Sequence, residues 1–73
     1  MNNLFALSVN SKLIGVFTSH LKATQTMWME TLPFGYKMEE YVFDFGIEFY
    51  TFRDNEDNEK TYELQEVTPD TRA

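Results

Sequence analysis

The chain has 73 residues, no cysteine and a formal net charge of -6 at pH 7. The absence of cysteine excludes disulfide-stapled folds, zinc ribbons and iron–sulfur sites. This length allows one small core, and 7 Phe, 4 Tyr and 1 Trp supply the apolar mass for it, because each ring buries roughly 150–250 Å². We therefore expect a single domain over residues 1–67 and a flexible C-terminal tail at 68–73.

The negative charge is concentrated in the C-terminal part of the chain. All 12 acidic residues lie between Glu30 and Asp70, and the first 29 residues contain Lys12, Lys22 and His20 but no acid. Such a chain repels free nucleic acid and anionic membranes, and it attracts a basic protein surface. No basic signal-peptide flank and no apolar run near the roughly 20 residues of a membrane span are present. We expect a soluble, cytoplasmic protein.

The first two predicted elements are strands joined as a hairpin. Residues 4–9 are apolar and bounded by asparagines, and residues 13–18 form a second apolar run. Asn10 and Ser11 lie between them, and asparagine tolerates the positive φ that a two-residue hairpin turn requires.

The third predicted element is a helix over residues 20–31. Ser19 is placed to cap it, although no Glu or Gln completes a capping box three residues later. Pro33 predicts its end, because proline disfavours helical conformation in the preceding residue. The apolar stripe at helical spacing consists of Leu21, Thr24, Trp28 and Leu32.

Three strands rich in aromatic residues follow the helix. They are expected over residues 36–45, 47–53 and 60–67, with a bulge or a tight connection at Gly46 and a polar loop at 54–59. Alternation along the first of these strands places Tyr41, Phe43 and Phe45 on one face of the sheet. It places Met38 and Val42 on the other face.

The predicted fold is α+β: an antiparallel sheet, with elements in the order β-β-α-β-β-β along the chain and one helix packed on one face. Trp28 is the expected anchor between helix and sheet. The third and fourth strands carry aromatic side chains on both faces, and only one helix is available to cover them. Some of these rings must therefore be exposed or paired with another chain.

No residue pattern predicts catalysis, a metal site or a cofactor. His20 is the single histidine, and it lies in the first turn of the predicted helix without a serine motif beside it. Glu39 and Glu40 point to opposite faces of a strand, which does not suit a catalytic carboxylate pair. The loop at 54–59 alternates oxygen ligands, but an EF-hand count from Asp54 meets Glu where glycine is needed and Gln where glutamate is needed. We expect a non-enzymatic protein.

Residues 13–23 resemble a stretch of many small phage and bacterial accessory proteins of unknown role. In these proteins a G-V-F-[ST]-S-x-x-x-A pattern carries the second strand of a hairpin into a capped helix, and an acidic, aromatic strand follows. Here Gly15 begins that pattern and Ala23 ends it, and Glu39-Glu40-Tyr41 lies in the acidic strand. The resemblance covers roughly the first 43 residues and transfers no site residue. It implies a phage-encoded protein, located in the host cytoplasm, that binds and disables a host factor.

The leading functional hypothesis is a protein-binding module, an inhibitor or modulator of a host protein, that uses the acidic aromatic sheet. Its partner would present a basic surface, as nucleic-acid-handling proteins do, and carboxylates at strand spacing could imitate the phosphates of DNA. The alternative is a structural or accessory homodimer formed through the aromatic sheet face or a sheet edge. The expected partner-binding residues are Glu39, Glu40, Asp44, Glu48, Tyr50, Phe52, Glu56, Asp57, Glu59 and Glu63.

Overall fold

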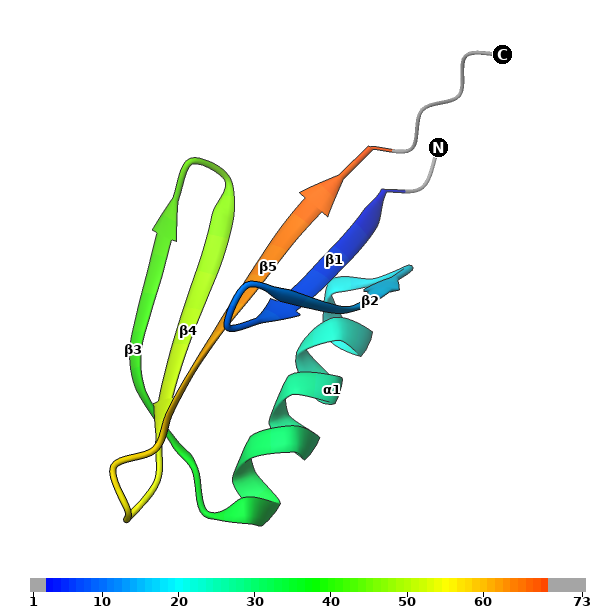
Figure 1. Ribbon diagram of the computed structural model, residues 1–73. Helices are drawn as coiled ribbons and strands as arrows, with labels where there is room; N and C mark the ends of the chain where they lie inside the picture. Colours follow the sequence, from blue (N-terminus) through cyan, green and yellow to red (C-terminus); the bar gives the residue numbers. More distant parts are fainter. Residues whose placement is uncertain (1–2, 69–73) are drawn as a thin grey trace.

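A five-stranded antiparallel sheet with one helix across one of its faces forms the structure (Figure 1). The computed structural model describes residues 3–68. In chain order the elements are β1 (Leu4–Val9), β2 (Lys12–Phe17), α1 (His20–Thr31), the 3₁₀ helix η1 (Leu32–Phe34), β3 (Lys37–Asp44), β4 (Ile47–Arg53) and β5 (Glu59–Val67). The α+β prediction is confirmed, with strand ends that differ from the predicted ones by at most one residue and a 3₁₀ helix that was not predicted. Of the predicted tail, all but Thr68 lies outside the described residues.

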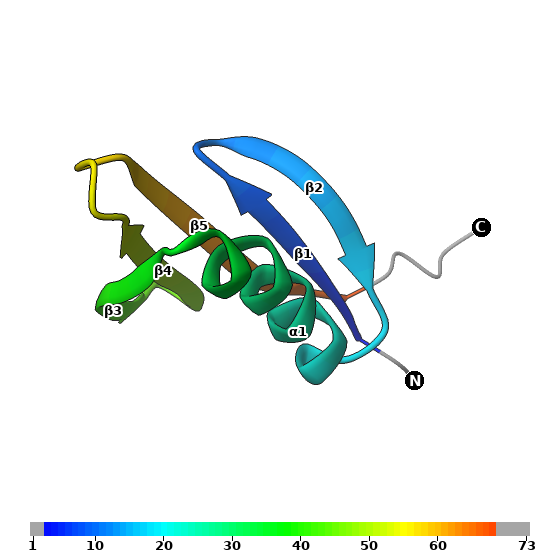
Figure 2. The same cartoon turned by 90° about the horizontal axis from the view of Figure 1, so that it is seen from below.

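The order of the strands across the sheet is β2-β1-β5-β4-β3, which differs from their order along the chain. α1 carries the chain from β2 at one edge to β3 at the other edge (Figures 1 and 2). The chain then returns through β4, and β5 fills the position between β4 and β1. The last strand therefore joins two hairpins, β1–β2 and β3–β4, into one sheet.

Both of these hairpins close through two-residue turns of the same kind. Asn10 and Ser11 have φ values of 49° and 69°, and Phe45 and Gly46 have φ values of 52° and 76°. Two successive positive φ angles define a type I′ turn, the connection that matches the twist of paired strands. The predicted hairpin is confirmed, and Gly46 belongs to a tight connection.

The bounds of α1 follow the predicted capping. The Ser19 hydroxyl accepts a hydrogen bond from the backbone N–H of Lys22 at 3.1 Å, as an N-cap should. The α-helix ends at Thr31, and a 3₁₀ turn follows it directly. Pro33 occupies an early position of η1, where its missing N–H is tolerated. Gly35 then ends η1 with a left-handed φ of 86°.

The face of α1 that packs on the sheet is only partly the predicted one, because Trp28 packs on the core but two other members of the predicted stripe do not. Leu21 and Leu32 are exposed, and the buried positions are Ala23, Met27 and Thr31. The small Ala23 side chain allows the helix backbone to lie close to the sheet. Thr31 can be buried because its hydroxyl donates to the Met27 carbonyl oxygen at 2.9 Å.

Aromatic rings form the centre of the core between α1 and the sheet. Phe52 is fully buried and meets Trp28 edge-to-face at 5.5 Å and Tyr62 at 5.7 Å between ring centroids. Leu7 and Leu64 extend the core along β1 and β5. Trp28 is thus a contact between helix and sheet, as predicted.

A β-bulge in β3 changes the predicted assignment of faces. Met38 lies opposite Phe52, and Tyr41 lies opposite Tyr50, with an irregularity between Met38 and Glu40. Because opposed residues share a face, Met38 points to the same side as Tyr41, and its predicted placement with Val42 is wrong. The extra residue at the bulge is the reason, since it reverses the alternation.

Candidate functional site

The β3–β4 hairpin carries an exposed aromatic surface. Every residue of β3 is exposed, and α1 makes its closest sheet contacts with β1 and β2 near the other edge. The exposed fractions rise toward the turn, from 46% at Tyr41 to 64% at Phe43 and 94% at Phe45, and Val42 is 41% exposed. We name Tyr41, Phe43 and Phe45 the hairpin patch; Val42 lies on the opposite face of β3.

Phe45 is the least expected member of the hairpin patch. It occupies the first turn position with a φ of 52°, where Asn10 stands with a φ of 49° in the β1–β2 turn. A left-handed backbone is unfavourable for a bulky side chain and tolerable for asparagine. Phe45 therefore combines a strained backbone with an almost fully exposed ring. Neither feature helps the chain to fold, which makes the turn a candidate contact site.

A polar cluster ties the helix N-terminus to this hairpin. His20 Nε2 lies 2.7 Å from one carboxylate oxygen of Glu48, and the Tyr41 hydroxyl donates to the other oxygen at 2.7 Å. The His20 ring also meets the Phe5 ring edge-to-face at 5.8 Å. The His20–Glu48 pair was not predicted, because these residues are 28 positions apart in the sequence.

Burial by itself would raise the pKa of the Glu48 carboxyl, but the hydrogen bonds from Tyr41 and His20 outweigh it and lower that pKa. Burial, together with the nearby Glu48 charge, raises the pKa of Tyr50. The hydrogen bond to Glu48 raises the pKa of Tyr41 as well. Among residues 3–68, no hydroxyl is hydrogen-bonded to the imidazole ring of His20, so the cluster lacks the nucleophile–base pair of a covalent catalyst. Its evident effect is to fix the turn end of the hairpin, because Glu48 lies directly opposite Phe43.

Replacing Glu48 with glutamine is expected to lower the free energy of unfolding at neutral pH by about 1 kcal/mol, because two hydrogen bonds lose their ionised acceptor. The folded-state pKa of Glu48 is lowered from its ordinary 4.5. Its contribution is therefore complete above that value and is lost as the pH falls through the folded-state pKa. Urea unfolding of both proteins between about pH 5.5 and pH 3 should show the difference shrinking with acidity. A constant difference would contradict this assignment, and Glu40→Gln at neutral pH is the control for removing one charge.

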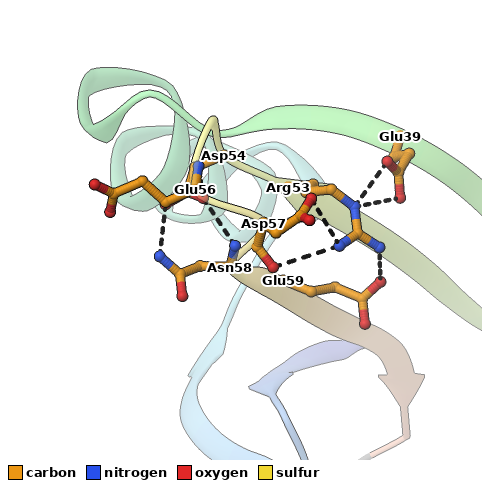
Figure 3. A network of polar contacts seen from close by, with 7 residues as sticks. All are labelled: Glu39, Arg53, Asp54, Glu56, Asp57, Asn58 and Glu59. Atoms are coloured by element: carbon orange, nitrogen blue, oxygen red, sulfur yellow. Dashed lines mark hydrogen bonds and ion pairs between the residues drawn. The ribbon is translucent and has the colours of Figure 1, made fainter.

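A second polar cluster surrounds Arg53 at the other end of β4 (Figure 3). The guanidinium donates to Glu39 at 2.9 Å and to Glu59 at 2.8 Å, and it lies 3.7 Å from the Asp57 carboxylate. The hydrogen bond to Glu39 is the main reason that the pKa of Arg53 is raised. Three predicted partner-binding carboxylates therefore share one internal cation.

The β4–β5 loop is held by its own side chains. The Asp54 carboxylate accepts hydrogen bonds from the Asn58 side chain at 3.0 Å and from the backbone N–H groups of Glu56 and Asn58, both at 2.9 Å. The hydrogen bond from the Asn58 side chain is the largest cause that lowers the pKa of Asp54. These contacts form an Asx-type turn, which explains why Asp54 and Asn58 occur in the loop without any need for a cation.

Replacing Arg53 with methionine should leave Glu39, Asp57 and Glu59 close together without a cation. Because the pairs are solvent-exposed, we expect only a small loss in the free energy of unfolding. Added salt should recover part of that loss by screening the repulsion. Urea unfolding at low and high NaCl measures both effects. Lys22→Met, which removes an exposed charge, should show neither, and an equal response of the two variants would contradict the prediction.

The predicted partner-binding residues do not form one surface. Glu40, Asp44 and Glu63 lie on the sheet face away from α1 and form no ion pair within residues 3–68. Phe52 is fully buried and Tyr50 is 7% exposed, so their proposed contact with a partner does not fit their placement. The remaining predicted residues are distributed over the two polar clusters and the loop: Glu39, Glu48, Glu56, Asp57 and Glu59.

Sequence reasoning did not select the hairpin patch as a site. The available signal was Phe45-Gly46 between two strands, at a position where Asn-Gly is the favoured pair. An aromatic residue in place of asparagine at such a turn indicates a requirement other than folding.

The hollows on the surface are shallow, and two of them are lined by paired groups. One of about 470 Å³ is lined by Glu30, Phe34, Tyr36, Asp54 and Lys60, and the Lys60 ammonium lies 4.7 Å from the centre of the Tyr36 ring. Another of about 290 Å³ lies beside His20 and Glu48. Within residues 3–68, no three His, Asp or Glu side chains gather as a metal site, and no helix has the length and apolar character of a membrane span.

Comparison of this chain with protein-family models, with curated proteins and with solved structures finds no match. The resemblance to small phage and bacterial accessory proteins remains a prediction from the pattern at residues 13–23.

Proposed function

We propose that this chain is a non-enzymatic protein-binding module that uses the β3–β4 hairpin to bind a partner with a basic surface. The observation that carries the proposal is Phe45, with its ring 94% exposed on a backbone of positive φ. A role as a phage-encoded inhibitor or modulator of a host nucleic-acid-handling protein would suit such a module.

The side chains of the hairpin patch support this proposal. Aromatic rings are frequent energetic anchors of protein interfaces, since they bury a large area with little loss of conformational entropy. Phe43 and Phe45 lie at the free end of the hairpin, where a partner can approach both rings. The cluster around Glu48 holds the hairpin beside this turn and limits the entropy lost on binding.

The charges near the hairpin patch indicate that the partner surface carries positive charge. Glu40 and Asp44 are exposed on β3 and have no cationic partner within residues 3–68. Such carboxylates accelerate the encounter with a basic surface and repel an acidic one. A second copy of this chain carries the same charge of -6, which disfavours the homodimer. DNA mimicry receives less support, because Glu39, Asp57 and Glu59 already surround Arg53.

The test uses a tagged form of the protein to isolate a partner, followed by affinity measurements with the purified pair. Replacing Phe43 and Phe45 together with alanine should weaken binding at least about 30-fold, as loss of an interface anchor does. Phe34→Ala is the matched control, because Phe34 is 70% exposed but lies at the far end of α1. Unchanged affinity in the double variant, or an equal loss in the control, would refute the proposal. A stable dimer in sedimentation that the double variant abolishes would favour the structural alternative.

A further inference from the structure

The free edge of β3 is open for pairing with another strand. β3 and β2 are the two edge strands of the sheet. β2 is interrupted by an irregularity between the residues paired with Leu7 and Ser8, and such a bulge protects an edge. β3 has its own bulge near its start, but residues 40–44 then pair with β4 in unbroken register. These residues contain no proline, no lysine and no bulge, and all of them are exposed.

The register identifies the backbone groups that this edge offers. Asp44 and Ile47 flank the two-residue turn and therefore form a hydrogen-bonded pair, as hairpins of this kind do. Hydrogen-bonded and non-hydrogen-bonded pairs alternate along an antiparallel ladder. Val42 and Glu40 consequently bond to β4, and the N–H and C=O groups of Tyr41 and Phe43 point away from it.

The side chains along the same segment define what an added strand must carry. On the sheet face away from α1 the sequence of side chains is Glu40, Val42, Asp44, and on the helix side it is Tyr41 and Phe43. Directly opposed side chains of paired strands interact, so a complementary strand places basic residues opposite the two carboxylates. Apolar or aromatic residues belong opposite Val42 and the two rings. The complementary pattern is two basic residues four positions apart, with three apolar or aromatic residues between them.

From this edge we infer that the partner binds by adding an extended segment of that pattern to β3, as a sixth strand of the sheet. The inference rests on the proposed function and specifies its mode. A second copy of β3 does not meet the requirement, because it would bring Glu40 and Asp44 toward the same residues of the first copy. A basic segment of another protein does.

The first experiment uses a synthetic nine-residue peptide with two lysines four positions apart, Val-Tyr-Val between them and Ser-Thr flanks. Amide hydrogen exchange of the isotope-labelled protein is measured by NMR with and without the peptide. Exchange at Tyr41 and Phe43 should slow at least about tenfold, because both amides gain a hydrogen bond, and the amides of β2 should not change. A peptide with glutamates in place of both lysines should have no effect. Failure of the lysine peptide to slow these two amides at millimolar concentration would overturn the inference.

The second experiment separates backbone pairing from contact with the ring. Phe43→Ala removes the ring and keeps the outward N–H, whereas Phe43→Pro removes both and leaves the pairing with β4 intact. The proline variant should bind the peptide at least about tenfold more weakly than the alanine variant. Its NMR spectrum shows whether β4 and β5 remain folded, and Phe43→Ser, which also keeps the N–H, should behave like the alanine variant.

The outcomes distinguish this inference from the proposed function. If the isolated partner depends on Phe43 and Phe45 but the proline and alanine variants bind equally, strand addition is wrong and the binding module stands. If the affinity for the partner does not depend on Phe43 and Phe45, the proposed function fails. Protection of the Tyr41 and Phe43 amides from exchange could also increase with protein concentration in the absence of peptide. That result would assign the edge to a second copy of the chain and overturn the inference.

Discussion

Replacing Phe52 with alanine is expected to lower the free energy of unfolding by about 3–5 kcal/mol, as truncation of a buried aromatic ring does. Phe52 has no exposed surface, and its ring contacts both Trp28 and Tyr62. Removing it leaves a cavity between α1 and β4 that these rings can fill only in part. Domains of this size are marginally stable, so much of the variant should be unfolded in water.

Urea unfolding followed by the fluorescence of Trp28 measures this loss directly, because the indole ring lies 5.5 Å from the Phe52 ring. Phe52→Leu, which retains most of the apolar volume, should lose about half as much stability. Phe43→Ala is the matched control, with the same chemical change at a ring that is 64% exposed, and it should change the free energy of unfolding by less than about 0.5 kcal/mol. Equal unfolding midpoints for wild type and Phe52→Ala would show that the core is assigned incorrectly.

Those parts of the fold that depend on short-range chemistry were predictable from the sequence. Asn10 and Ser11 indicated the first turn and Ser19 the start of α1, and the structure places each of them there. Gly46 indicated a bulge or a tight connection, and the structure shows the tight connection. In each case the backbone conformation is set by the residue itself or by a neighbour three positions away. These preferences are independent of the tertiary packing.

The face of α1 could not be chosen from its hydrophobicity. The predicted stripe included Leu21 and Leu32, whereas the sheet is covered by Ala23, Met27 and Thr31. Close packing favours small side chains where two backbones approach, even when larger apolar residues are available nearby. A preference of this kind depends on the shape of the opposing surface, which a single helix sequence does not contain.

The polar clusters were unpredictable for a related reason. Arg53 binds Glu39 across the β3–β4 register, and His20 binds Glu48 from another element, so both contacts depend on the arrangement of the strands. The sequence shows which residues are acidic, but it does not show which of them pair with a cation or a histidine of the same chain. Counting free carboxylates therefore overestimated the acidic surface that a partner would meet.

Replacing Phe45 with asparagine is expected to stabilise the fold and to weaken partner binding. Asparagine adopts the left-handed conformation that this turn position requires at a φ of 52°, and it withdraws an exposed ring from water. We expect a gain of about 0.5–1 kcal/mol in the free energy of unfolding, in the range of other substitutions that relieve an unfavourable backbone. Affinity for the partner should fall at least about tenfold, because the most exposed ring of the hairpin patch is lost.

The β1–β2 turn provides the reciprocal experiment within the same molecule. Asn10→Phe places the same aromatic residue on a similar backbone, at a φ of 49°, and also removes the hydrogen bond that the Asn10 side chain accepts from the Thr61 N–H at 3.1 Å. It should lower the free energy of unfolding by about 1–2 kcal/mol. Urea unfolding of the two variants should therefore give changes of opposite sign. Binding should follow a different pattern, since Asn10→Phe leaves the β3–β4 hairpin intact and should retain affinity. If Phe45→Asn instead destabilises the protein, Phe45 has a folding role, and the exposed ring no longer argues for a contact site. If it stabilises the protein and impairs binding, the chain retains an unfavourable turn residue because its partner requires it.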